Sequence, residues 1–366
     1  MTKAPDAIRV LIVDDSAVIR GALGRIVDEQ PDMFVVTTAP NGRVALDALK
    51  HSKIDVVLLD IEMPEMDGLT ALPFILSAYP ATRVIMASSL TQRGAEVTMQ
   101  ALAMGAADFI AKPAAKAGSA TLVAISIEIA SKVRAVGRAA RGRSDSRPAS
   151  ARVSASVRTE LLASRSAIAV PRVVAIASST GGPNALATVL SALPKDFALP
   201  ILITQHMPAV FTTLLAQRLE RDTGRTCVEA KDGDDIRANV TYIAPGGFHM
   251  IVQTNEGKPY VRLSEAEPEN FCRPSADPMF RSIAAIYGAS AIAVVLTGMG
   301  VDGMTGCEQV KARGGRIVVQ DEATSVVWGM PGAIVRAGLD PVVTSVDEIG
   351  QTILNWCENS AGAIAA

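Results

Sequence analysis

The sequence is poor in cysteine, and the few cysteines it has are scattered. Its 366 residues include only four of them, and no two form a CxxC motif. They are Cys227, Cys272, Cys307 and Cys357. Zinc sites and disulfide frameworks need cysteines at characteristic spacings, so neither feature is indicated. Unpaired thiols suit a reducing compartment.

Net charge and long apolar runs are lacking too. The formal net charge is -2, which argues against attraction of the whole chain to nucleic acid or to acidic membranes. No stretch approaches the ~20 apolar residues that span a bilayer. We therefore expect a soluble, cytoplasmic, monomeric protein that neither inserts into a membrane nor binds nucleic acid.

One segment departs from this average. Between residues 131 and 170, nine basic residues stand against two acidic ones in a background rich in Ser and Ala. A tether to nucleic acid or to a membrane would use such charge. The segment contains no aromatic residue, however, and this composition favours a flexible, solvated linker over residues 137–170.

Hydrophobic residues make up 49% of the chain, enough for packed cores, and its length suits two domains. In the first, over residues 1–136, short runs rich in Val, Ile and Leu alternate with helical patterns, the last of which begins near Ser119. The runs are residues 8–13, 33–38, 54–59, 83–87 and 107–111. Near-continuous apolar strands separated by helices predict an α/β fold with a five-stranded parallel sheet covered on both faces.

The same alternation resumes over residues 171–360. Its apolar runs are residues 172–177, 200–205, 240–244, 291–297 and 316–319. They predict a second doubly wound α/β domain with a mostly parallel sheet.

Charged and hydroxylic residues stand where the strands of the first domain end. They are Asp14, Asp15, Asp60, Ser88 and Lys112. The carboxyl ends of parallel strands form one crevice, so these side chains should converge. Three carboxylates repel unless a hard cation such as Mg²⁺ neutralises them. We expect Asp60, on the central strand, to accept a phosphoryl group, with Ser88 and Lys112 binding its oxygens. Taken singly, Asp14 and Asp15 could be helix caps.

These residues, with the Leu-Asp60-Ile-Glu-Met-Pro and Lys112-Pro113 motifs, resemble the response-regulator receiver family. The resemblance covers about residues 8–136. It implies a flavodoxin-like fold, phosphoryl transfer from a histidine kinase, and a role for Phe109 as an aromatic switch.

A glycine-containing turn joins a strand to a helix at Ser179-Thr180-Gly181-Gly182. Ser179 projects from this turn and needs a base to become a nucleophile. The chain has three histidines, and His206 is the best candidate because it ends the neighbouring strand. His51 lies on a receiver helix, and His249 remains a rival base or a structural residue.

The orienting acid should follow another strand, where the sequence supplies Asp302 in a glycine-rich loop. The amide of Met299 in this loop is a reasonable oxyanion donor. Other interpretations are open from the residues alone: the first turn as a helix cap, His206 as a buried polar residue, and the second loop as a phosphate cradle.

Four motifs together resemble the chemotaxis protein-glutamate methylesterase family, also called CheB. They are Ser179-Thr180-Gly181-Gly182, Gln205-His206-Met207-Pro208, Ile243-Ala244-Pro245-Gly246-Gly247 and the segment from Leu296 to Gly303. The resemblance implies that Ser179 is the nucleophile, His206 the base, Asp302 the orienting acid and Met299 part of the oxyanion hole, with no cofactor in this domain. It also implies hydrolysis of glutamate γ-methyl esters on chemoreceptors and deamidation of receptor glutamine.

Two residues depart from the usual family pattern: Ala177 replaces a glycine, and Cys272 stands where histidine is more usual. We expect neither to touch the triad. Alternative functions are a receiver-controlled hydrolase or binding module of a non-motility pathway, and a DNA-binding regulator, which the many strands of the second half disfavour. We further expect the unphosphorylated receiver to cover Ser179.

Overall fold

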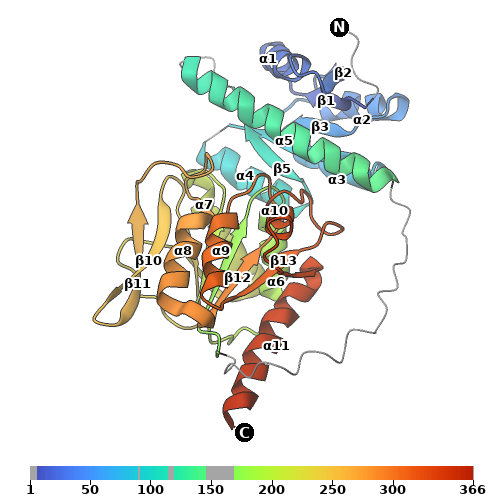
Figure 1. Ribbon diagram of the computed structural model, residues 1–366. Helices are drawn as coiled ribbons and strands as arrows, with labels where there is room; N and C mark the ends of the chain where they lie inside the picture. The colour runs from blue at the N-terminus through green and yellow to red at the C-terminus, as the bar shows by residue number, and fades with distance from the viewer. Residues whose placement is uncertain (1–5, 90, 114–118, 146–168, 366) are drawn as a thin grey trace.

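The computed structural model describes residues 6–89, 91–113, 119–145 and 169–365. They form two α/β units, one above the other in Figure 1. The fold class expected from the sequence is confirmed in both. None of the helices in the described ranges is both long and apolar enough to cross a membrane.

The first unit is built on a five-stranded parallel sheet in the order β2-β1-β3-β4-β5. Its strands are β1 (Ile8–Val13), β2 (Met33–Ala39), β3 (Val56–Asp60), β4 (Arg83–Ser88) and β5 (Asp108–Ala111). Its helices are α1 (Ala17–Asp28), α2 (Gly42–His51), α3 (Gly68–Ala78), α4 (Gln92–Ala103) and α5 (Ser119–Asp145).

Alternation along β1 shows how the two faces of this sheet are covered. Val10 and Ile12 pack with α1 and α5 on one face, whereas Leu11 and Val13 pack with α2, α3 and α4 on the other. Successive side chains of a strand point to opposite faces, so an apolar strand can support helices on both. The last helix starts at Ser119 as expected but runs beyond residue 136. Residues 146–168, most of the predicted linker, lie outside the described ranges.

The second unit has a seven-stranded sheet in the order β14-β13-β12-β6-β7-β9-β8, in which every pairing is parallel. Its strands are β6 (Val173–Ser178), β7 (Ile201–Gln205), β8 (Thr226–Glu229), β9 (Val240–Ile243), β12 (Ala291–Val295), β13 (Arg316–Gln320) and β14 (Val342–Thr344). An antiparallel ribbon of β10 (His249–Asn255) and β11 (Lys258–Ser264) stands apart from it.

Helices cover both faces of this second sheet as well. On one face lie α6 (Gly182–Ser191), α7 (Ala209–Thr223) and α11 (Val346–Ala365). On the other lie α8 (Ala276–Tyr287), α9 (Met304–Ala312) and α10 (Met330–Arg336). The chain leaves β6 towards β7 on one side and returns to β12 on the other, so a topological switch point lies at β6. Ligand sites are expected at this edge.

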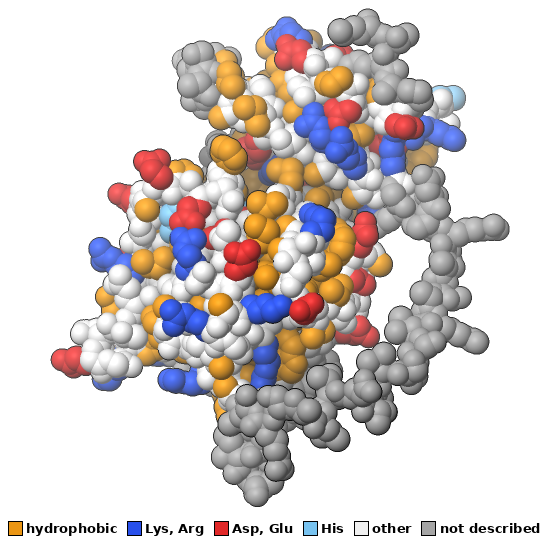
Figure 2. Space-filling model, in the orientation of Figure 1, with side chains coloured by type: hydrophobic (Ala, Val, Ile, Leu, Met, Phe, Trp, Pro, Cys, Tyr) orange, Lys and Arg blue, Asp and Glu red, His pale blue; other side chains and the backbone are white. Residues whose placement is uncertain are grey.

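The two units share an apolar boundary. Helix α4 of the first packs against α6 and α7 of the second. The ring of Phe109 in β5 packs against that of Phe211 in α7 in a tilted arrangement, with centroids 4.2 Å apart. Met299, Val326 and Val327 of the second unit pack with the core of the first. Figure 2 shows hydrophobic side chains gathered where the two units meet. The receiver-like unit therefore rests on the switch-point edge of the second sheet.

Candidate functional site

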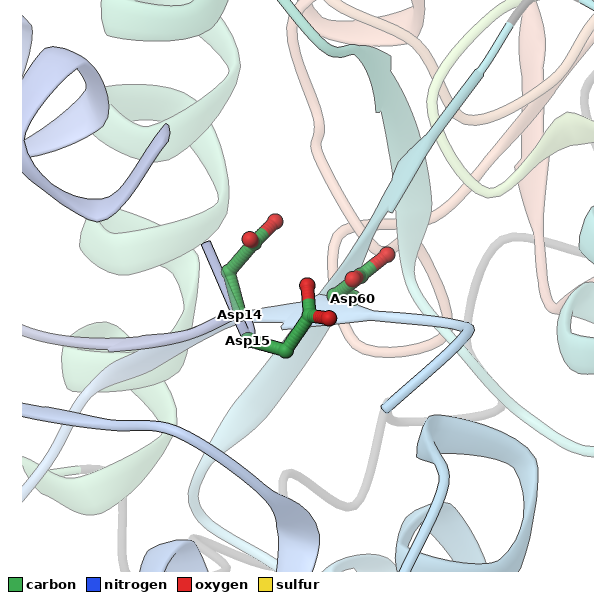
Figure 3. Close-up of side chains that lie close together, drawn as sticks. All are labelled: Asp14, Asp15 and Asp60. Carbon is green, nitrogen blue, oxygen red and sulfur yellow. The ribbon is translucent and has the colours of Figure 1, made fainter. Parts of the chain in front are cut away.

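Three carboxylates converge at the carboxyl edge of the first sheet. Oxygens of Asp14 and Asp15, which follow β1, and of Asp60, which ends β3, lie within 4.8 Å of one another. Figure 3 shows the three side chains gathered on one side of the sheet edge. Asp14 and Asp60 are buried and Asp15 is exposed. The predicted convergence of these acids is present.

Lys112 follows β5 and enters the same crevice. Its Nζ lies 2.8 Å from Asp14 Oδ2 and 2.6 Å from Asp60 Oδ1. Burial raises the pKa of Asp60, and the opposing effect of Lys112 leaves it above its ordinary value. Burial lowers the pKa of Lys112, but its two carboxylate partners outweigh this and raise it. The lysine therefore stays charged beside the acids.

The two other predicted receiver residues face elsewhere. The Ser88 hydroxyl lies 3.1 Å from the Ser89 carbonyl oxygen and accepts a hydrogen bond of 2.7 Å from Thr98 of α4. Its hydrogen bonds to described residues do not include Asp60. Phe109 is buried and turned towards the second unit, where it meets Phe211. Sequence motifs locate these positions but not the directions of their side chains.

The turn after β6 positions Ser179. Gly181 has a φ of 79°, a left-handed conformation that suits glycine, and α6 begins beside it with Pro183 in its first turn. The Ser179 amide donates to the Thr297 carbonyl over 3.0 Å. Its half-buried hydroxyl makes no hydrogen bond with any residue that the structure describes. The nucleophile candidate is thus held by its backbone while its side chain is unengaged by the described residues.

His206 comes directly after β7, and its amide donates to the Ser178 carbonyl over 3.1 Å. Ser178 and Gln205 are register partners, so Ser179 and His206 are the next residues on adjacent parallel strands. His206 Nε2 lies 2.7 Å from Asp302 Oδ2. The structure therefore brings all three candidates to one edge of the sheet, and Nδ1 is the ring nitrogen that Asp302 leaves free.

Asp302 is buried and surrounded by donors. Its Oδ1 accepts hydrogen bonds from Ser275 Oγ at 2.6 Å and Asn270 Nδ2 at 2.9 Å, and its Oδ2 accepts one from the Ala276 amide at 2.6 Å. Burial raises the pKa of this carboxyl group, but the hydrogen bond and charge of His206, with the hydrogen bonds from Ala276 and Ser275, lower it to about 2. A carboxylate held this way is a fixed anion beside the imidazole.

The expectation that Cys272 does not touch the triad is wrong. Its Sγ lies 3.5 Å from His206 Nδ1. Burial lowers the pKa of His206, but hydrogen bonds and charge from Asp302 and Cys272 outweigh this and raise it to about 10. Both partners therefore stabilise the imidazolium, the form that His206 takes once it has accepted a proton.

Both other histidines lie away from this chemistry. His249 is buried, with Nδ1 accepting a hydrogen bond from the Ser275 amide and Nε2 lying 3.1 Å from the Glu267 carbonyl oxygen. Both of its ring nitrogens are engaged, which makes it structural. His51 is exposed on α2, as predicted.

The glycine-rich loop after β12 runs directly against Ser179. A Cβ on Gly298 would lie 2.9 Å from Ser179 Cβ and would clash with Met330 Sδ, so only glycine fits there. The next residue, Met299, packs its side chain against the core of the first unit. Its amide, the proposed oxyanion donor, hydrogen-bonds to no residue in the described ranges.

Polar contacts link the first unit to this site. Thr180 Oγ1, next to the nucleophile candidate, donates to Asp108 Oδ2 of β5 over 2.5 Å. Asn184 Nδ2 of α6 donates to the Leu102 carbonyl of α4 over 2.8 Å. Sequence reasoning missed both contacts, because nothing in the local pattern of either residue signals a partner in the other unit.

This fold and these sites define a class: a receiver-like domain resting on a second, parallel α/β unit that brings a serine, a histidine and an aspartate to one edge of its sheet. A family model described as CheB methylesterase matches residues 174–353, and one described as response regulator receiver domain matches residues 10–123. The chain belongs to the protein-glutamate methylesterase/protein-glutamine glutaminase family, and the resemblance noted in the sequence is confirmed.

Relatives match over nearly the whole chain. The chain is 48% identical to protein-glutamate methylesterase/protein-glutamine glutaminase 1 of Paramagnetospirillum magneticum, covering 96% of each. It is 48% identical to the protein-glutamate methylesterase/protein-glutamine glutaminase 2 of Caulobacter vibrioides, covering 96% of this chain and 100% of the relative. The crystal structure of the Thermotoga maritima CheB methylesterase catalytic domain is 38% identical, with a TM-score of 0.50, and covers 51% of this chain and 99% of that one.

Proposed function

We propose that this protein hydrolyses glutamate γ-methyl esters on chemoreceptors, releases methanol, and deamidates receptor glutamines during chemotaxis adaptation. A chemotaxis histidine kinase, on this proposal, activates it through Asp60. We place the activity in the cytoplasm and expect the protein to act as a monomer. The observation that carries the proposal is the 2.7 Å contact between His206 and Asp302 beside Ser179, together with the names of its relatives.

The residues suggest one order of events. His206 Nδ1 takes the Ser179 proton as Oγ attacks the ester carbonyl, because Nε2 is held by Asp302. The carbonyl oxygen becomes an oxyanion near the Met299 amide. The methoxide leaves with the proton from His206, and water then resolves the acyl-enzyme by the same proton path. A glutamine amide follows the same steps and releases ammonia.

The acidic crevice fits a divalent cation. Its three carboxylate groups offer the hard oxygen ligands that Mg²⁺ prefers, from Asp14, Asp15 and Asp60. Mg²⁺, when bound, neutralises these charges and those of an incoming phosphoryl group. Asp60 is the proposed phosphoryl acceptor, and Lys112 already lies 2.6 Å from its Oδ1. Ser88 must turn away from Thr98 to reach a group on Asp60.

A continuous route runs from this crevice to the hydrolytic site. Ser88 ends β4, which pairs with β5, and β5 carries Asp108 and Phe109. Asp108 contacts Thr180 beside Ser179, and Phe109 contacts Phe211 in the helix that follows His206. We propose that these contacts hold the receiver over the site and loosen on phosphorylation.

Replacing Asp60 with asparagine should remove stimulation by an acyl phosphate such as acetyl phosphate. The amide cannot form the mixed anhydride, so a stimulation of about 5–150-fold is lost. Methanol released from a methyl-esterified receptor measures it, with and without the phosphodonor. Asp47→Asn, an exposed acid on α2, should keep the full stimulation. Stimulation that persists in Asp60→Asn contradicts the proposed acceptor.

Replacing Asp108 with alanine should raise the rate of the unphosphorylated protein about 5-fold or more, since the hydrogen bond to Thr180 is lost. The measurement is methanol release without a phosphodonor, compared with Asp47→Ala. Phosphorylation of Asp108→Ala checks that the receiver is folded. A basal rate equal to that of the unsubstituted protein argues against this contact as a restraint.

A further inference from the structure

Cys272 lies against the one ring nitrogen that catalysis needs. Asp302 occupies His206 Nε2, so the Ser179 proton must pass to Nδ1. In the structure, the partner of Nδ1 is the thiol of Cys272 at 3.5 Å, while the Ser179 hydroxyl bonds to no described residue. The base is therefore engaged by a cysteine, not by its nucleophile.

The segment carrying Cys272 is firmly anchored. The Cys272 amide donates to the Glu269 carbonyl over 2.9 Å, and the Glu269 carboxylate pairs with Arg281 at 2.6 Å. Asn270 donates to both Asp277 and Asp302. Asn270 and Phe271 have φ values of 53° and 62°, an uncommon conformation that persists only where surroundings impose it. These contacts hold the loop in a defined conformation that keeps the thiol against the imidazole.

We propose that Cys272 is a positioning residue for the catalytic base: its thiol holds the Nδ1 edge of His206 at rest and yields it to Ser179 when substrate enters. The part played by Ser179 rests on the proposed function, whereas the contact between thiol and imidazole does not. The thiol competes weakly, because sulfur is a poor hydrogen-bond partner, so a substrate-bound serine can displace it.

The charges around His206 give this proposal a direct readout. Asp302 and Cys272 contact the ring. The charged groups of Asp277, Glu269 and Arg281 interact electrostatically with Asp302. Cys272 is one of the two groups that raise the pKa of His206 against the effect of burial. Removing the thiol should lower the pKa of His206, while the contact between Asp302 and Nε2 keeps the ring in place.

The test compares Cys272→Ala with Cys272→Ser in the full chain. Both variants open nearly the same space to water, but only serine keeps an atom that can accept a hydrogen bond from the protonated Nδ1. NMR of ¹³C-labelled histidine rings follows the titration of His206, which is assignable because the chain has only three histidines and His206→Gln removes its signal. Cys357→Ser is the matched control for losing a thiol, and the His51 and His249 signals report folding.

We expect His206 in Cys272→Ala to titrate about half a pH unit or more below its position in Cys272→Ser, as the loss of one weak hydrogen bond implies. The acidic limb of the methanol-release profile should move in the same direction. Equal titration in the two variants overturns the proposal. A shifted titration without any esterase activity in the unsubstituted chain keeps the contact and rejects the proposed function instead.

Discussion

Replacing Ser179 with alanine is expected to abolish methanol release, lowering kcat by at least about 10³-fold. Alanine removes the only atom proposed to attack the ester and leaves the turn intact, because Ser179 is held through its amide by Thr297. A coupled assay for methanol, with a methyl-esterified receptor as substrate, measures the loss. The substitution lies outside the receiver, so phosphorylation of Asp60 should be unchanged.

A second serine gives the matched control. Ser191 ends α6, the helix that begins beside Ser179, and is exposed. Ser191→Ala should therefore keep full activity. If Ser179→Ala retained activity at the level of this control, the turn would be a binding loop and the nucleophile would lie elsewhere. Retained binding of receptor by an inactive Ser179→Ala protein would separate recognition from chemistry.

The position of a polar residue directly after a predicted parallel strand is enough to predict which of these residues lie close together. Asp60 and Lys112 meet in one crevice, and His206 meets Asp302, because parallel strands bring their carboxyl ends to one edge. A strand followed by a polar residue is visible in sequence without any knowledge of distant contacts. The apolar runs located β1 and β7 for the same reason, since both are fully or nearly fully buried.

Elements outside this logic escaped prediction. The strands β10, β11 and β14 were not predicted. Strand β10 is buried only in its first half, β11 is mostly half-buried, and β14 is three residues long, so their apolar runs are short or interrupted. Asn270 and Cys272 reach the triad from an irregular loop, where no periodicity predicts which side chain points inward. The direction of Ser88 depends on Thr98 in α4, a tertiary contact that a motif cannot reveal.

The contacts between the two units also depend on tertiary structure, so the sequence did not predict them. The sequence led to the expectation that the receiver covers the hydrolytic site. The receiver resemblance assigned Phe109 a role but gave it no partner. In the structure Phe109 meets Phe211, and its neighbour Asp108 meets Thr180. Adjacent residues of one strand thus touch both the helix that follows the base and the turn that carries the nucleophile.

Replacing Asp302 with asparagine should lower kcat by about 10²–10⁴-fold and also destabilise the fold. Both carboxylate oxygens accept hydrogen bonds: Oδ2 from Ala276 and, through its contact with the ring, His206; Oδ1 from Ser275 and Asn270. An amide has one acceptor oxygen, so its NH₂ group must face a donor, at a cost of about 1–3 kcal/mol in unfolding free energy. The imidazole also loses the anion that fixes Nδ1 as the acceptor.

The pH dependence of unfolding separates these effects. The pKa of Asp302 is lowered to about 2, so its stabilising contribution is present above the pKa of the unfolded carboxyl and is lost as pH falls towards 2. Asp302→Asn should lack this part of the acid destabilisation, measured by denaturant unfolding at several pH values. Asp340→Asn, an exposed acid of the same unit, should match the unsubstituted protein in both stability and kcat. A variant that is less stable yet fully active at a temperature where it stays folded would limit Asp302 to a structural role, because an orienting acid must affect the rate of the folded enzyme.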